Sequence, residues 1–165
     1  MGIEGISAKL YWECYRTIVK DNLFLHRKYH PSSDIVNATL NLGYSFLANE
    51  ISTQLSAYKL DLELGFIHSI SYGRNSLVLD MMEEFRAVFI DNWVAVLFNK
   101  HLLNANCFKG ADENFYLTDE GFKKFCKLYN EHLEEKSWTQ IFKTQAEKLK
   151  NFIVSEAEYE PYKQN

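Results

Sequence analysis

Proline and glycine are scarce in this chain, which has two prolines and seven glycines among its 165 residues. Because these residues are the main interruptions of regular structure, few breaks are forced on the chain. Long segments with apolar residues at helical spacing predict an all-α fold. No apolar run reaches the roughly 18 residues of a membrane span, and no secretory signal opens the chain. We therefore expect a cytoplasmic protein without a membrane partner.

Cysteine is also scarce, and the common catalytic motifs are missing. The three cysteines are widely spaced and include no C-x-x-C pair, so neither a zinc finger nor a disulfide framework is indicated. No phosphate loop, H-E-x-x-H, G-x-S-x-G or G-x-G-x-x-G motif is present. The 18 basic and 22 acidic residues give a net charge of −4. This balance argues against tight non-specific DNA binding by charge alone, although single faces can still be basic.

The hydrophobic content of 47% is enough for a core, so we predict one domain over residues 1–165. Its expected architecture is a helical bundle around a long central helix that is apolar on nearly all sides. Residues from about 155 to 165 are expected to form a loosely ordered tail. Expected N-caps are Asp34, then Asn75 or Ser76, and then Thr118 with Asp119. The predicted helices span residues 7–20, 35–58, 77–103, 119–136 and 138–153, with a loop or small hairpin at 104–118.

A stripe of uncharged polar residues runs along the helix expected at 35–58. Asn37, Asn41 and Tyr44 recur at spacings that place them on one face. A solvated face normally carries Lys and Glu, so the stripe predicts a partly buried polar surface. The asparagines either cap and cross-link neighbouring segments or line a functional site.

Carboxylates interrupt the apolar stretch "GFIHSISYGRNSLVLDMMEEFR" at residues 65–86. Asp80 and Glu83 are three positions apart and Asp80 and Glu84 are four apart, so each pair shares a helix face. Burying an ionised carboxylate costs several kcal/mol unless something offsets it. The possible offsets are solvent along a narrow stripe, ion pairs with Arg74 or Arg86, and a bound cation.

The plainest interpretation gives these residues no chemistry. Glu83, Glu84 and Arg86 would form the solvated edge of the helix, and His68 would be a hydrogen-bonded core histidine. The combination favours another interpretation, because His68 comes just before the carboxylate helix. One imidazole with two or three carboxylates suits Mn²⁺, and Mg²⁺ less well. A metal there would serve phosphodiester chemistry.

At this point the sequence resembles a known family. The run "SDIVNATLNLGYSFLANEISTQLSAYKLDLELGFIHSISYGRNSLVLDMMEEFRAVFID" is similar to the core of the CRISPR-associated adaptation integrase, usually called Cas-one. The flanking "MGIEG", the later "FYLTDEGFKKF" and the terminal "YEPY" are similar to that family too. The resemblance extends from about residue 3 to residue 162, and its motifs are several and in order.

The resemblance implies a metal-dependent DNA endonuclease and integrase of CRISPR antiviral defence. Such enzymes join 3′ ends of captured DNA to the repeat array, as homodimers bridged by the small partner Cas-two. By resemblance, Glu4, His68 and Glu83 hold Mn²⁺ or Mg²⁺. Asp80 matches a further acid of the site. Glu4 comes from the resemblance alone, since by itself it is a helix N-terminal glutamate favoured by the macrodipole.

The resemblance also assigns supporting residues. Arg74 matches a basic position and is expected to grip a DNA phosphate. Tyr44, Asn37 and Asn41 match an N-x-x-x-N-x-G-Y pattern and are expected to line or support the active site. Arg86 is a candidate partner for the carboxylates.

Full members of the family begin with a β-rich domain before the G-I-E-G turn, which this sequence lacks. We therefore expect weak or absent integrase activity from the chain alone. The alternative function is a catalytically silent helical module that binds DNA or a partner. The trio Glu4, His68 and Glu83 distinguishes the two, because a silent module has no need of it.

Overall fold

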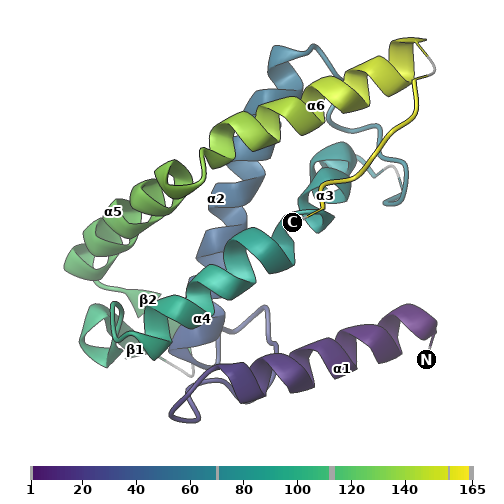
Figure 1. The fold of residues 1–165 in the computed structure, drawn as a ribbon. Coiled ribbons are helices and arrows are strands. Elements are labelled where there is room, and N and C mark those ends of the chain that lie inside the picture. The colour runs from purple at the N-terminus through teal and green to yellow at the C-terminus, as the bar shows by residue number, and fades with distance from the viewer. Residues whose placement is uncertain (1, 70, 112–113, 156, 164–165) are drawn as a thin grey trace. The chain divides into compact units, whose positions relative to one another are not determined.

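The structure, a computed structural model, describes residues 2–69, 71–111, 114–155 and 157–163, without the side chains of Glu4 and Ala111. It confirms the all-α prediction, with one antiparallel hairpin at the position where a loop or small hairpin was expected. Figure 1 shows the elements. In chain order they are α1 (Ile3–Ile18), α2 (Ile35–Ala57), α3 (Ser76–Glu83), the π-helix η1 (Arg86–Asp91), α4 (Asn92–Asn99), the 3₁₀ turn η2 (Ala105–Cys107), β1 (Phe108–Ala111), β2 (Asn114–Leu117), α5 (Asp119–Glu135) and α6 (Trp138–Ser155).

The chain forms two compact units. The first combines Met1–Gly43 with Asn92–Leu128, and the second combines Tyr44–Asp91 with Tyr129–Asn165. The prediction of one domain over residues 1–165 stays a prediction.

Polar side chains fix the helix ends of the first unit. Asp34 is the predicted cap of α2, and its Oδ1 accepts a hydrogen bond from the Asn37 amide at 2.7 Å. Thr118 caps α5 in the same way, because its Oγ1 accepts from the Gly121 amide at 3.0 Å. These two capping predictions are confirmed.

Asn99 closes the end of α1 from a distant part of the sequence. Its side chain accepts from the Lys20 amide and donates to the Ile18 carbonyl oxygen, both at 2.9 Å. Replacing Asn99 by alanine is expected to lower the free energy of unfolding by about 1–2 kcal/mol, because both backbone groups lose their partner. Urea denaturation followed by circular dichroism measures this loss. Asn151→Ala, on the exposed face of α6, is the matched control and should change little.

The second unit is built around α3, η1 and α6. The prediction of one helix over 77–103 is wrong, because α3 ends at Glu83 and a π-helix follows. Phe85 and Phe89 are four positions apart and share a face, and both pack on Phe142 of α6, with ring centroids at 4.8 and 5.1 Å. The predicted central helix is expected to be apolar and buried, and this is confirmed for its part in the second unit. Leu77, Val78, Met81, Met82, Phe85, Phe89 and Ile90 all lie in the core.

The predicted capping of α3 by a side chain is wrong. Asn75 is the N-cap residue and makes no capping hydrogen bond with its side chain. The hydroxyl of Ser76 instead donates to the Ser69 carbonyl oxygen at 3.0 Å, so it closes the preceding loop.

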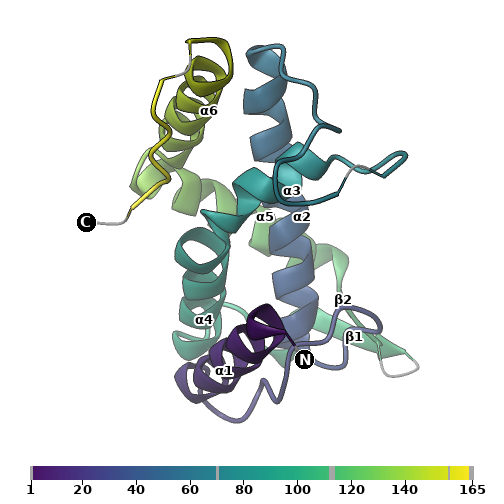
Figure 2. The same cartoon turned by 90° about the vertical axis from the view of Figure 1, so that its right-hand side faces the viewer.

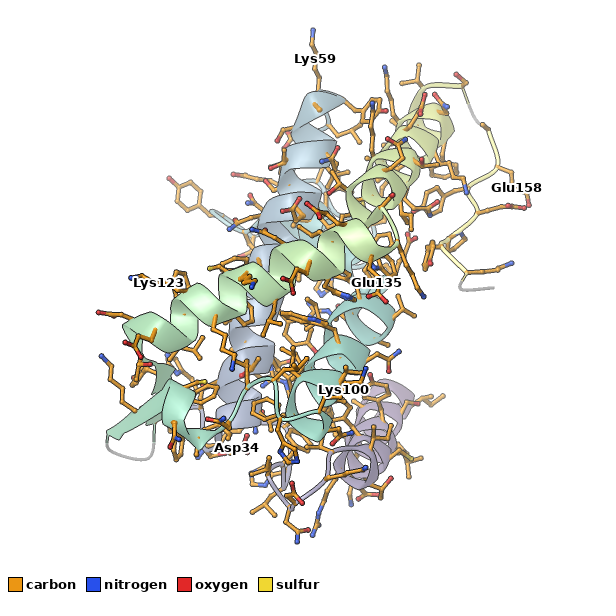
Figure 3. The ribbon with its side chains drawn as sticks, turned by 60° about the vertical axis from the view of Figure 1, so that its left-hand side comes forward. Asp34, Lys59, Lys100, Lys123, Glu135 and Glu158 are labelled. Atoms are coloured by element: carbon orange, nitrogen blue, oxygen red, sulfur yellow. The ribbon has the colours of Figure 1, made fainter. Side chains whose placement is uncertain are left out.

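Among the described residues, no helix is long and apolar enough to cross a membrane. Figure 3 shows Lys59 pointing away from the end of α2.

Figure 2 shows the chain turning back after α6. The loose ordering predicted for about 155–165 stays a prediction, but Tyr159 and Tyr162 in this stretch have defined partners.

Candidate functional site

Asp80 holds the turn that carries His68. Its Oδ2 accepts from the backbone amides of Phe66 and Ile67 at 2.5 and 2.9 Å. Its Oδ1 accepts from the His68 amide at 2.9 Å and from the His68 ring Nδ1 at 2.5 Å. Burial raises the pKa of Asp80, but the hydrogen bonds from Ile67, His68 and Phe66 outweigh it, and the pKa falls below its ordinary value. Asp80 is therefore an ionised clasp on residues 66–68.

The clasp fixes the tautomer of His68. An ionised carboxylate only accepts hydrogen bonds, so Nδ1 of His68 carries the proton that points at Asp80. This leaves a lone pair on Nε2, and the side chain is 33% exposed. A carboxylate behind a histidine is the usual arrangement at metal-binding histidines, where it orients the ring and raises its basicity. His68 is thus prepared as a ligand or as a proton acceptor.

Gly65 is the residue that gives Asp80 room. A Cβ at this position would lie 2.7 Å from the Ser76 Cβ and 2.9 Å from the Asp80 Oδ2. A larger residue at this position must displace the Asp80 carboxylate and weaken the hydrogen bonds that it accepts from the backbone amides.

Gly65→Ala is accordingly expected to lower the free energy of unfolding by about 1–3 kcal/mol, through overpacking and loss of the clasp. Gly2→Ala is the control, because a Cβ there meets no atom within 4 Å. Equal thermal unfolding temperatures for the two variants would contradict this role of Gly65.

Glu83 lies one turn beyond Asp80 and is more open to solvent. Its side chain is 48% exposed, and its Oε1 accepts from the Arg86 Nε at 2.8 Å. The Arg86 guanidinium lies over the ring of Tyr44, 4.9 Å from the centroid. The Tyr44 hydroxyl in turn donates to the buried Asp91. Arg86 is therefore the partner of a carboxylate, as predicted, and Tyr44 supports it from α2.

Asn37 and Asn41 hold the connection between α1 and α2. Their Oδ1 atoms accept from Nη1 and Nη2 of Arg27, at 2.9 and 2.6 Å. Their amide groups donate to the carbonyl oxygens of His26 and Tyr29. The structure thus supports the cross-linking alternative for both asparagines. They belong to the first unit and His68 to the second, and their place at an active site stays a prediction.

Arg74 is engaged within its own loop. Its Nη2 donates to the carbonyl and hydroxyl oxygens of Ser69, and its Nε donates to the Ser76 Oγ at 3.3 Å. Gly73 before it has φ +71°, a left-handed conformation that favours glycine. A contact of Arg74 with a DNA phosphate stays a prediction.

The donor set for a metal is incomplete among the described side chains. Glu4 lies in α1, in the first unit, and its side chain is outside the described residues. Within the described part, no group of three His, Cys, Asp or Glu side chains is placed to hold a metal ion. The free Nε2 of His68 and the solvent-facing Glu83 nevertheless suit a metal as two of its ligands. Asp80 does not join them, because both of its oxygens are already used.

Sequence reasoning found His68 and the carboxylates of α3, but it missed three residues. Gly65 and Asp91 were not singled out, and the hydrogen bonds from Arg27 to Asn37 and Asn41 were not predicted. A glycine directly before the F-I-H run was the one available signal for Gly65.

Comparisons with known proteins give the family. The family described as "CRISPR associated protein Cas1" matches residues 1–131. CRISPR-associated endonuclease Cas1 3 of Thermus thermophilus is 31% identical over 98% of the chain and 52% of its own length. CRISPR-associated endonuclease Cas1 1 of Thermodesulfovibrio yellowstonii is 39% identical over 81% of the chain and 43% of its own length.

Solved structures agree with the sequence relatives. A Cas1 protein from Thermotoga maritima has a TM-score of 0.88 and 26% identity over 98% of the chain and 54% of its own. A casposase bound to integration product has a TM-score of 0.85 and 25% identity over 99% of the chain and 52% of its own. The chain spans about half the length of the curated relatives it matches and corresponds to their C-terminal part. It belongs to the Cas1 family of CRISPR-associated proteins.

Proposed function

We propose that the chain carries the catalytic residues of a metal-dependent DNA endonuclease and integrase of CRISPR spacer acquisition. The single observation that carries this proposal is the Asp80–His68 clasp, which holds Nδ1 and leaves Nε2 of a partly exposed histidine for a ligand. A histidine that only packs in the core does not require a carboxylate that also accepts hydrogen bonds from three backbone amides. The names of the relatives, which are endonucleases and a casposase with its integration product, support the same reaction class.

His68 and Glu83, with Glu4, would hold Mn²⁺ or Mg²⁺. When bound there, such an ion would neutralise charge on the scissile phosphate and stabilise the departing 3′ oxygen. Asp80 keeps the His68 ring oriented, so that Nε2 points away from the carboxylate. Arg86 holds one oxygen of Glu83 and leaves the other for a ligand. Where no ion is bound, Nε2 of His68 can still accept a proton from an attacking hydroxyl.

The partners proposed are DNA, a second copy of the chain and the small adaptation partner Cas-two. Because the chain spans about half of its relatives, we expect slow DNA cleavage or joining rather than robust integration. A cytoplasmic location stays a prediction.

A strand-transfer assay tests this proposal. A fluorescent oligonucleotide with a free 3′ hydroxyl is incubated with plasmid DNA and Mn²⁺, and both joining and nicking are followed. Weak, Mn²⁺-dependent products that disappear in His68→Ala would support the enzyme. DNA binding without any metal-dependent product would favour the silent module, and robust integration would contradict the expected weakness.

A further inference from the structure

The segment after α6 is tied to the end of α3. We call residues 157–163 the C-terminal strap; Figure 1 shows it in yellow, leaving the end of α6 and turning back. Both α3 and the strap belong to the second unit. Figure 3 shows Glu158 projecting outward from the strap. Its neighbour Tyr159 instead hydrogen-bonds to Glu84.

Glu84 gathers the polar contacts of the strap. Its Oε1 accepts from the Tyr159 hydroxyl. Its Oε2 accepts from the Tyr162 amide at 2.8 Å and from the Gln145 Nε2 at 2.9 Å. Gln145 of α6 is buried and also donates to the Glu160 carbonyl oxygen at 3.2 Å. This hydrogen bond links the strap directly to α6. Burial raises the pKa of Tyr159, with Glu84 adding to the effect, so the hydroxyl remains a donor.

Aromatic packing holds the same segment. The ring of Tyr162 lies 5.4 Å from that of Phe85 and 5.8 Å from that of Trp138. The ring of Tyr159 lies 6.2 Å from that of Phe152. Tyr159 and Tyr162 are thus each held by a hydrogen bond to Glu84 and by a ring contact, in addition to the bond from Gln145 to Glu160.

The strap and the candidate site share a cleft of about 420 Å³ in the second unit. Its lining includes Tyr159 and Pro161 of the strap together with Phe66, Asp80 and Glu83. Because strap residues and site residues line one cleft, loss of the strap would remove part of the wall that Glu83 shares.

We propose that Glu84 is a positioning residue, which fixes the end of α3 that presents Glu83 by holding the C-terminal strap. Glu83 is the last residue of α3, and helix ends lack half of their backbone hydrogen bonds. Glu84 follows it directly and anchors this end through three donors, while Phe85 packs on Tyr162. The assignment rests on the proposed function, because it takes Glu83 as a metal ligand.

Hydrogen exchange followed by mass spectrometry tests the anchor without any metal. In Glu84→Ala, peptides covering 157–163 and 82–86 are expected to exchange at least about tenfold faster than in the parent. Tyr159→Phe removes one hydroxyl only and should accelerate the strap peptide to a smaller extent. Glu134→Ala, which removes an exposed glutamate of α5, and Tyr72→Phe, at a fully exposed ring, are the controls.

Mn²⁺ titration by calorimetry tests the positioning role. Glu84→Ala is expected to weaken Mn²⁺ binding by about tenfold, the lower end of the effect of residues that orient ligands. Unchanged exchange of residues 157–163 in Glu84→Ala would overturn the anchor. Faster strap exchange with unchanged exchange at 82–86 and unchanged Mn²⁺ affinity would overturn the positioning role. A parent chain that binds no Mn²⁺ would overturn the proposed function, and the exchange data would still decide the anchor.

Discussion

Replacing His68 by alanine is expected to weaken Mn²⁺ binding at least about 100-fold. The variant loses the nitrogen ligand at Nε2 and keeps only the two carboxylates of the three proposed ligands. Isothermal calorimetry on the parent and the variant measures the difference directly. Glu83→Ala should produce a loss of similar size, because it removes another of the proposed ligands.

His101→Ala is the matched control, since this histidine is exposed and lies just after α4. It should leave the affinity for Mn²⁺ unchanged. If the His68 and His101 variants both bind Mn²⁺ as tightly as the parent, the ion is held elsewhere and the proposed site is wrong.

Replacing Asp80 by alanine is expected to lower the free energy of unfolding by about 3 kcal/mol. The change removes the acceptor of three backbone amides and of the His68 ring. Donors left without a partner in a partly buried turn account for most of this loss. Urea denaturation at pH 7 measures it. Asp80→Asn keeps one acceptor oxygen, so its free energy of unfolding should lie between those of the parent and of the alanine variant.

The pH dependence of the same variants tests the charge of Asp80. The folded-state pKa of Asp80 lies below its ordinary value of 3.8. The ionised clasp therefore contributes stability that is fully present above that value and is lost as the pH falls through the folded-state pKa. The stability difference between the parent and Asp80→Ala should shrink as the pH falls below about 4. A difference that stays constant down to pH 2 would contradict an ionised clasp.

Much of the candidate site could be predicted from one stretch of sequence. His68, Asp80 and Glu83 stand out because they interrupt an apolar stretch, where an ionised group is costly unless something offsets it. Which of the three side chains holds the turn and which two face a possible ligand could not be predicted. That Asp80 serves the turn at 66–68 depends on the path of a loop, and loop paths are not encoded in helical spacing.

The asparagine stripe shows the same limit. The uncharged pattern at Asn37 and Asn41 correctly predicted a partly buried polar surface. Their partner Arg27 lies ten and fourteen positions earlier in a connection without periodicity, so the contact could not be anticipated. Glu4 marks the opposite case, because only family resemblance selected it.

The π-helix changes the direction in which Asp91 faces relative to the residues of α3. A π-turn holds about one residue more than an α-turn, and one residue corresponds to about 100° around the axis. Deleting one residue within 86–91 would restore an uninterrupted α-helical path with almost the same composition. Such a deletion would rotate Asp91 away from the Tyr44 hydroxyl while Arg86 kept its place beside Glu83. The extra residue therefore sets the direction of the Asp91 side chain, which lets it accept the hydrogen bond from the Tyr44 hydroxyl.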